Sequence, residues 1–109
     1  MTVNVKELHR QAMEMADNAD KLRTAGNATE AQLVYGQAAG REFTAARATP
    51  VQPSRAILYR SAAWLSVNAG MPNVAIMTAE EGMEDAPDEI AAELHEVIAK
   101  AEALIASGT

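Results

Sequence analysis

The chain has 109 residues, no cysteine, 4% aromatic residues and a formal net charge of −6. This length predicts one domain, residues 1–109, around a single core. The absence of cysteine excludes disulfides and thiolate metal sites, and the acidic balance argues against nucleic acid and anionic membrane surfaces as partners. Because no apolar run approaches the ~18 residues of a membrane span and the N-terminus lacks an apolar signal core, we expect a cytoplasmic protein.

Alanine is the commonest residue, with 24 of the 109 positions. It has the highest helix propensity and a small side chain, so the composition favours closely packed helices. No segment alternates apolar and polar residues in the manner of a strand. The sequence therefore predicts an all-α fold.

The first helix is predicted over residues 4–25. Asn4, followed three residues later by Glu7, resembles a capping box, and the apolar residues that follow are spaced by three and four. Gly26 and Asn27 interrupt this pattern. We expect Asn27 to cap the next helix.

The second helix is predicted over residues 28–48. It contains Gly36 and Gly40, four residues apart, and each costs about 1 kcal/mol relative to alanine in a helix. This cost indicates a close approach of another helix or a local bend. The same spacing mediates dimerisation in membranes, but Gln37 and Arg41 make this segment too polar for that.

The central helix is predicted over residues 54–70, after a proline-containing joint at residues 49–53. Ser54 is a favourable N-cap and Gly70 a favourable terminator. Apolar residues occupy nearly every face of this helix, which also contains Trp64, the single tryptophan. Such a helix normally packs on more than one side.

The last two helices are predicted over residues 72–84 and 87–106, each opened by a proline. The final helix is apolar on one face and acidic on the other, which is typical of a cap on a helical stack. Residues 79–109 contain nine acidic residues and one lysine. This end is either a solvated face or a docking surface for a basic partner. The apolar residues of the shorter helix are Val74, Ala75, Ile76, Met77, Ala79 and Met83.

The two inter-helix turns share a residue pattern. The residues concerned are Gly26, Asn27, Glu30, Ala31, Tyr35 and Ala38 at the first turn, and Gly70, Ala75, Gly82 and Pro87 at the second. These residues resemble the second half of a tetratricopeptide (TPR) repeat, although the two turn glycines lie 44 residues apart against a usual period of about 34. The resemblance implies two antiparallel hairpins, residues 4–48 and 54–84, and a capping helix, 87–106, in a short right-handed α-solenoid. A generic alanine-rich bundle is the alternative.

The TPR resemblance implies a non-enzymatic adaptor or scaffold that binds a peptide or partner helix in a groove lined by the first helix of each repeat. The implied lining residues are Asp20, Arg23, Ile57, Arg60, Trp64, Val67 and Asn68. Four of these, from Ile57 to Val67, also share one helical face by their spacing alone. Apolar and aromatic residues beside an arginine are typical of interface hot spots. Whether Trp64 lines an open groove or packs under a neighbouring helix stays open.

Self-association is the alternative function, since two repeats bury little core and a homodimer would cover the remaining apolar surface. We expect no catalytic activity, no cofactor and no metal. His9 and His95 lack the spacing of zinc or di-iron motifs. The expected partner is therefore a protein or peptide, with no role for nucleic acid or membrane.

Overall fold

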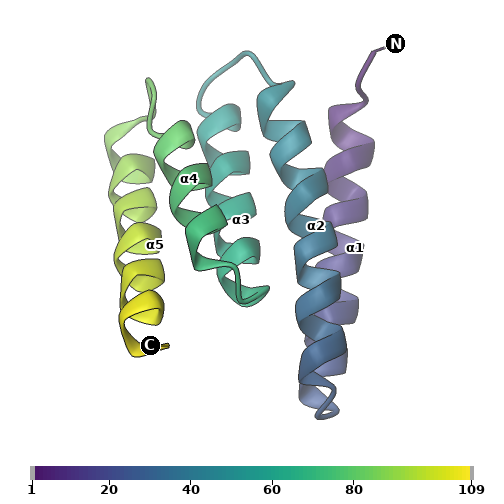
Figure 1. Ribbon diagram of the computed structural model, residues 1–109. Coiled ribbons are helices and arrows are strands. Elements are labelled where there is room, and N and C mark those ends of the chain that lie inside the picture. The colour runs from purple at the N-terminus through teal and green to yellow at the C-terminus, as the bar shows by residue number, and fades with distance from the viewer. Residues whose placement is uncertain (1, 109) are drawn as a thin grey trace.

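Five helices make up the fold in the computed structural model, which describes residues 2–108. They follow one another across the molecule from α1 to α5, each runs antiparallel to the next (Figure 1), and α3 also contacts α5. Residues 2–108 contain no strand, so the all-α prediction is confirmed. The predicted bounds are correct to within two residues. The helices are α1 (Val5–Thr24), α2 (Ala28–Arg47), α3 (Ser54–Asn68), α4 (Pro72–Gly82) and α5 (Asp88–Ser107).

The helix ends follow the predicted signals at three places. The Asn4 side chain accepts a hydrogen bond from the backbone N–H of Glu7 at 3.0 Å, which caps α1. Gly26 and Gly70 have φ angles of 88° and 72°, in the left-handed region that favours glycine. The N–H after each glycine donates to a carbonyl five residues back, at 2.9 and 3.0 Å. Both glycines therefore end their helices as predicted.

Two predicted caps are wrong. Pro53 occupies the N-cap position of α3 with helical φ and ψ angles, so Ser54 lies inside the first turn and makes no capping bond. The Gln52 side chain takes over this role by accepting from the backbone N–H of Ala56 at 3.0 Å. Asn27 precedes α2, but its ψ of 62° is not extended and its side chain makes no capping bond.

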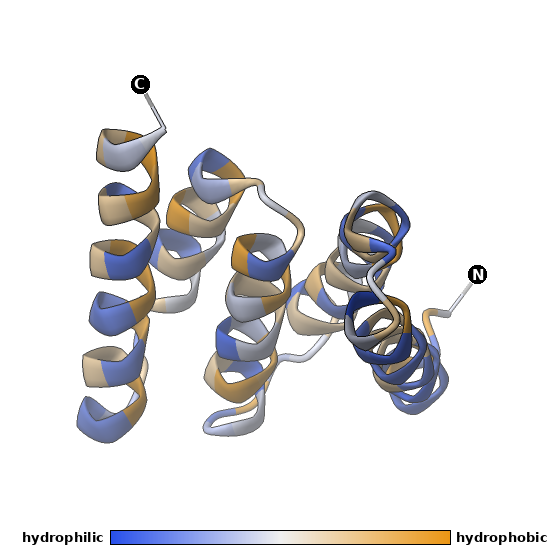
Figure 2. Ribbon diagram, turned by 90° about the horizontal axis from the view of Figure 1, so that it is seen from below, coloured by the Kyte–Doolittle hydropathy of each residue, from blue (hydrophilic) through white to orange (hydrophobic). Residues whose placement is uncertain are grey.

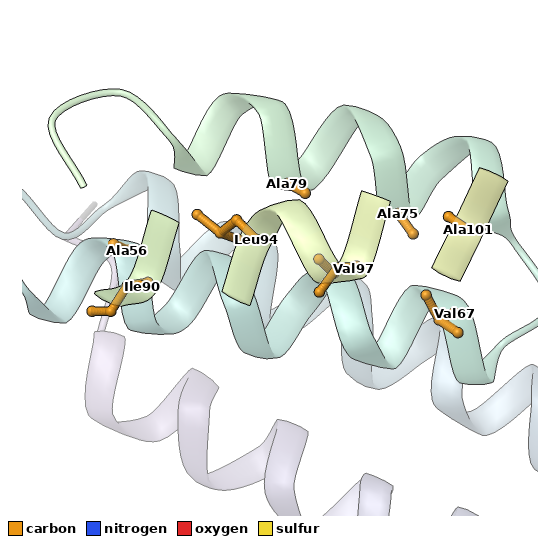
Figure 3. Close-up of a cluster of buried hydrophobic side chains, with 9 residues drawn as sticks. Ala56, Val67, Ala75, Ala79, Ile90, Leu94, Val97 and Ala101 are labelled. Carbon is orange, nitrogen blue, oxygen red and sulfur yellow. The ribbon is translucent and has the colours of Figure 1, made fainter. Parts of the chain in front are cut away.

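Helix α3 is the centre of the packing, since it contacts α2, α4 and α5. The prediction that this helix packs on more than one side is confirmed. On one side, small residues let α4 and α5 approach it closely (Figure 3). Figure 2 shows the hydrophobic residues of α5 on the side that faces α3 and α4. The core residues at this junction are Ala56, Ala63, Val67, Ala75, Ala79, Ile90, Leu94, Val97 and Ala101.

The buried face of α4 differs from the predicted one. Its buried residues are small, namely Ala75, Thr78, Ala79 and Gly82, whereas Val74 and Met77 are exposed. The reason is the short distance between α4 and α3. A Cβ atom on Gly82 would lie 2.4 Å from the Cβ of Tyr59, so this contact accepts only small residues. Val74 and Met77 therefore face outward, whereas Ile76 is partly buried and packs against the core.

The α1–α2 hairpin has an alanine-rich interface and one buried glutamate. Glu42 of α2 is fully buried, and Nδ1 of His9 on α1 lies 2.8 and 3.0 Å from its two carboxylate oxygens. Small apolar residues such as Ala12, Ala19 and Ala38 form much of the rest of the interface, together with the buried Tyr35.

Candidate functional site

Helix α3 carries most of the residues predicted to line a groove. Ile57 and Trp64 lie on one face of α3 and keep 38% and 36% of their surface exposed. The Trp64 side chain is thus partly covered by its neighbours and partly exposed to solvent. Arg60, on the same face, donates to Glu93 of α5 at 2.6 Å. Helix α5 therefore engages part of the surface predicted to bind a ligand.

The C-terminal end of α3 places the last two predicted residues differently. Val67 is only 9% exposed and packs in the core with residues of α4 and α5. Its predicted place in the lining of a groove is wrong, because α5 covers it. Asn68 is exposed. Of the predicted lining residues on α3, Ile57, Trp64 and Asn68 are exposed.

Asp20 and Arg23 lie on α1 and contact α2. Asp20 accepts a hydrogen bond from the hydroxyl of Tyr35, and an Arg23 nitrogen lies 3.4 Å from an Asp20 oxygen. The Arg23 guanidinium lies 5.3 Å from the centre of the Tyr35 ring. Burial raises the pKa of the Tyr35 hydroxyl, and the Asp20 carboxylate raises it further. Asp20 and Arg23 are therefore engaged within the first hairpin.

A second surface, absent from the predictions, lies between α2 and α4. Both helices pack on α3, and a cavity of about 260 Å³ lies between them. We call it the α2–α4 groove. Its lining residues are Gly36, Ala39, Gly40, Phe43, Arg47, Ser66, Met71, Val74, Met77, Thr78 and Glu81.

The wall of the groove on α2 is built on the two glycines. A Cβ atom on Gly40 would meet no atom within 4 Å, and one on Gly36 would meet Ala69 and Met71 at 3.9 Å, an ordinary contact distance. The predicted close approach of another helix is therefore wrong at Gly40, where the space beside the backbone is open. Gly40 thus weakens α2 at a position where nothing in the described chain packs against it.

The wall on α4 and the mouth of the groove are apolar. Met77 and Val74 keep 67% and 41% of their surface exposed, and Met71 keeps 37%. Leu33, one turn before the glycines on α2, is 65% exposed and lines a shallow extension of the groove together with Met71. These side chains form an exposed apolar surface over two helices.

Thr78 adds a polar group to the groove. The residue lines the cavity and is only 4% exposed. No hydrogen bond of its hydroxyl is found within residues 2–108, whereas the hydroxyl of Ser66 donates to the carbonyl of Ala62 at 3.0 Å. No fully buried side-chain polar atom of the described residues lacks a hydrogen-bond partner. Since the Thr78 hydroxyl has no partner, its oxygen must be partly accessible from the cavity. Thr78 therefore offers one hydrogen bond to a molecule in the groove.

An ion pair closes one end of the groove. Arg47 of α2 donates from two nitrogens to the two oxygens of Glu81 on α4, each at 2.8 Å, and the Tyr59 hydroxyl donates to Glu81 at 2.5 Å. Hydrogen bonding to Arg47 and then to Tyr59 lowers the pKa of Glu81 to about 2. Burial, and next the hydrogen bond to Glu81, raises the pKa of Tyr59 to about 12. Arg47 also stacks over Phe43, at 4.6 Å from the ring centre.

The two histidines lie on α1 and α5. His9 faces Glu42, and His95 is exposed on α5. Within residues 2–108, no three His, Asp or Glu side chains are grouped so that they could hold a metal ion. Over the same range, no helix combines the length and apolar character needed to cross a bilayer.

Comparisons of the chain with protein families, with curated proteins and with solved structures gave no match. The TPR resemblance therefore rests on the residues of this chain. The spacing of Gly36 and Gly40 is the one signal of the groove in the sequence. It does not reveal that the space beside Gly40 is open.

Proposed function

We propose that this chain is a non-enzymatic protein-interaction module, made of two TPR-like hairpins and a capping helix, that holds a helix of a partner protein. The observation that carries this proposal is the α2–α4 groove, with the open space beside Gly40 and the exposed Met71 and Met77. The TPR-like arrangement is supported by two observations. Each hairpin turns at a glycine, and each helix packs mainly on the helices next to it in the chain.

The groove is favoured over the predicted first-helix surface because it needs no rearrangement. On α3, Val67 is in the core and Arg60 is held by α5, whereas the groove is accessible as it stands. Ile57 and Trp64 form a second candidate surface. Ile57 lines a shallow cavity of about 570 Å³ between the start of α3 and the start of α5.

Capture of partners from extract of the native cells tests the proposal with one variant for each surface. Gly40→Leu fills the groove from a position with no neighbour within 4 Å, and Trp64→Ala alters the first-helix surface. Asn18→Leu, at an exposed position of α1, is the matched control. All variants are first compared with wild type by circular dichroism and thermal melting.

A partner that is retained by wild type and Asn18→Leu but lost by Gly40→Leu supports the groove. A partner lost only by Trp64→Ala moves the interface to α3. If every variant retains the same partner, both surfaces are wrong.

Self-association is the second candidate, because Leu33 and Met77 expose about two thirds of their surface. Light scattering over a range of concentrations measures the molar mass directly. A dimer that persists on dilution and is disrupted by Gly40→Leu would assign the groove to a second copy of the chain.

A further inference from the structure

The charges around the α2–α4 groove identify the kind of helix that fits it. Resting on the proposed function, we infer that the partner segment is an amphipathic helix whose apolar face is flanked by lysine or arginine. This inference names the chemistry of the partner, and three observations on the groove carry it.

The shape of the groove fits one helix. On α2 it extends from Gly36 to Arg47, which corresponds to about 16 Å, or three turns, at 1.5 Å per residue. A partner backbone can approach α2 closely at Gly40, which has no side chain and no neighbouring atom within 4 Å of where its Cβ would lie. Residues 2–108 contain no strand edge to which an extended peptide could add. Docking of a helix through anchors spaced by three and four residues is the remaining common mode.

The lining of the groove selects an apolar face. Met71 and Met77 are flexible and polarisable, so they adapt to the shape of an inserted side chain. The volume of about 260 Å³ is below the ~300–1,000 Å³ of typical small-molecule pockets. It suits one or two side chains of a docked helix. Thr78 at the base provides a hydrogen bond for a polar group among them.

The flanks of the groove are acidic. Among the described residues of its lining, Arg47 is the only cationic one, and Glu81 holds it with two hydrogen bonds. Glu30 lies beside the Leu33 end, and Glu80 lies on the exposed side of α4, one turn after Met77. The ion pairs of the described chain include neither of these glutamates. Basic residues beside the apolar face of a partner helix would be attracted to Glu30 and Glu80.

The same charges disfavour a second copy of the chain as the occupant. Two chains of net charge −6 repel each other. The helices with an apolar face, α1 and α5, already use that face in the core.

Two fluorescein-labelled synthetic helices of about 18 residues test this inference. They share one leucine- and alanine-rich face, and its flanks are lysine in one peptide and glutamate in the other. Binding is measured by fluorescence anisotropy at low and at physiological salt. The proteins are wild type, Gly40→Leu, the control Asn18→Leu, and the double variant Glu30→Gln/Glu80→Gln.

We expect wild type and Asn18→Leu to bind the lysine peptide at least tenfold more tightly than the glutamate peptide. Gly40→Leu should weaken binding of the lysine peptide at least tenfold. The double variant should weaken it severalfold and reduce its dependence on salt.

Equal affinity for the two peptides, or no binding of either, overturns the inference about charge. Unchanged affinity of Gly40→Leu for the lysine peptide overturns the placement in the groove, since the peptide then binds elsewhere on the acidic surface. The proposed function is tested separately. A native partner that is lost by Gly40→Leu but lacks a basic helix would sustain the function and refute this inference.

Discussion

Arg47 of α2 and Glu81 of α4 form a two-bond ion pair that joins the two hairpins. The pair lies at the surface, where an isolated ion pair contributes little to stability. Here the Tyr59 hydroxyl from α3 also donates to Glu81, so three helices meet at one carboxylate. The position of this carboxylate fixes the closed end of the α2–α4 groove.

Acid should weaken the fold through Glu81. Its pKa falls from the ordinary value of 4.5 to about 2, chiefly because of Arg47. Because the pKa is lower in the folded state, the stabilisation is present above about pH 4.5 and is lost as the pH falls toward 2. The melting temperature of wild type should therefore fall more steeply between these values than that of Glu81→Gln. Glu80→Gln should retain the wild-type slope, and equal slopes for all three proteins would contradict the role of Glu81.

Two glycine substitutions should have opposite effects. Gly82→Ala places a Cβ atom 2.4 Å from the Cβ of Tyr59, so α3 and α4 must separate, at a cost of roughly 1–3 kcal/mol. Gly40→Ala meets no atom within 4 Å and should stabilise α2 by up to about 1 kcal/mol. Urea unfolding measures both values. A loss of stability in Gly40→Ala would show that the space beside this residue is not open.

The stability of the fold should depend on the contact between His9 and the buried Glu42. His9→Ala leaves a fully buried carboxyl group without its hydrogen-bond partner, which costs about 1–3 kcal/mol. Replacing the carboxylate as well, in His9→Ala/Glu42→Met, should recover most of this loss, because an apolar residue of similar size needs no partner. Urea unfolding of both variants decides the matter. The prediction fails if the double variant is no more stable than His9→Ala.

The Arg60–Glu93 pair should help to hold α5 on α3. The side chains are 29% and 46% exposed, so their coupling should be at most about 1 kcal/mol. Arg60→Glu places two like charges together and should lower the melting temperature, and the exchange Arg60→Glu/Glu93→Arg should restore it. A double-mutant cycle gives the coupling directly. A coupling of zero would show that α5 is held by its apolar face alone.

The helices could be predicted from the sequence because local signals fix their ends. Gly26 and Gly70 adopt the left-handed conformation that ends a helix, and prolines separate the remaining elements. The predictions failed where neighbouring helices decide the outcome. Val74 and Met77 belong to an apolar pattern on α4, but the short distance at Gly82 excludes large side chains from the α3 contact.

The candidate site was less predictable for the same reason. The spacing of Ile57, Arg60, Trp64 and Val67 places them on one face of a helix. Whether another helix covers part of this face depends on where the chain places α5, which contacts Arg60 and packs with Val67. Gly36 and Gly40 are unusual within a helix and therefore visible in the sequence. Whether another helix fills the space beside them depends on tertiary packing, which cannot be predicted from their spacing.

Gly36 and Gly40 also set the local stability of α2. Glycine has the greatest backbone freedom in the unfolded state, so this segment of α2 should open more often, and exchange its amide hydrogens faster, than it would with alanine at both positions. A helix bound across this segment would suppress that opening. Slower amide exchange near these glycines would therefore report occupancy of the groove in the intact protein, with no label on the partner.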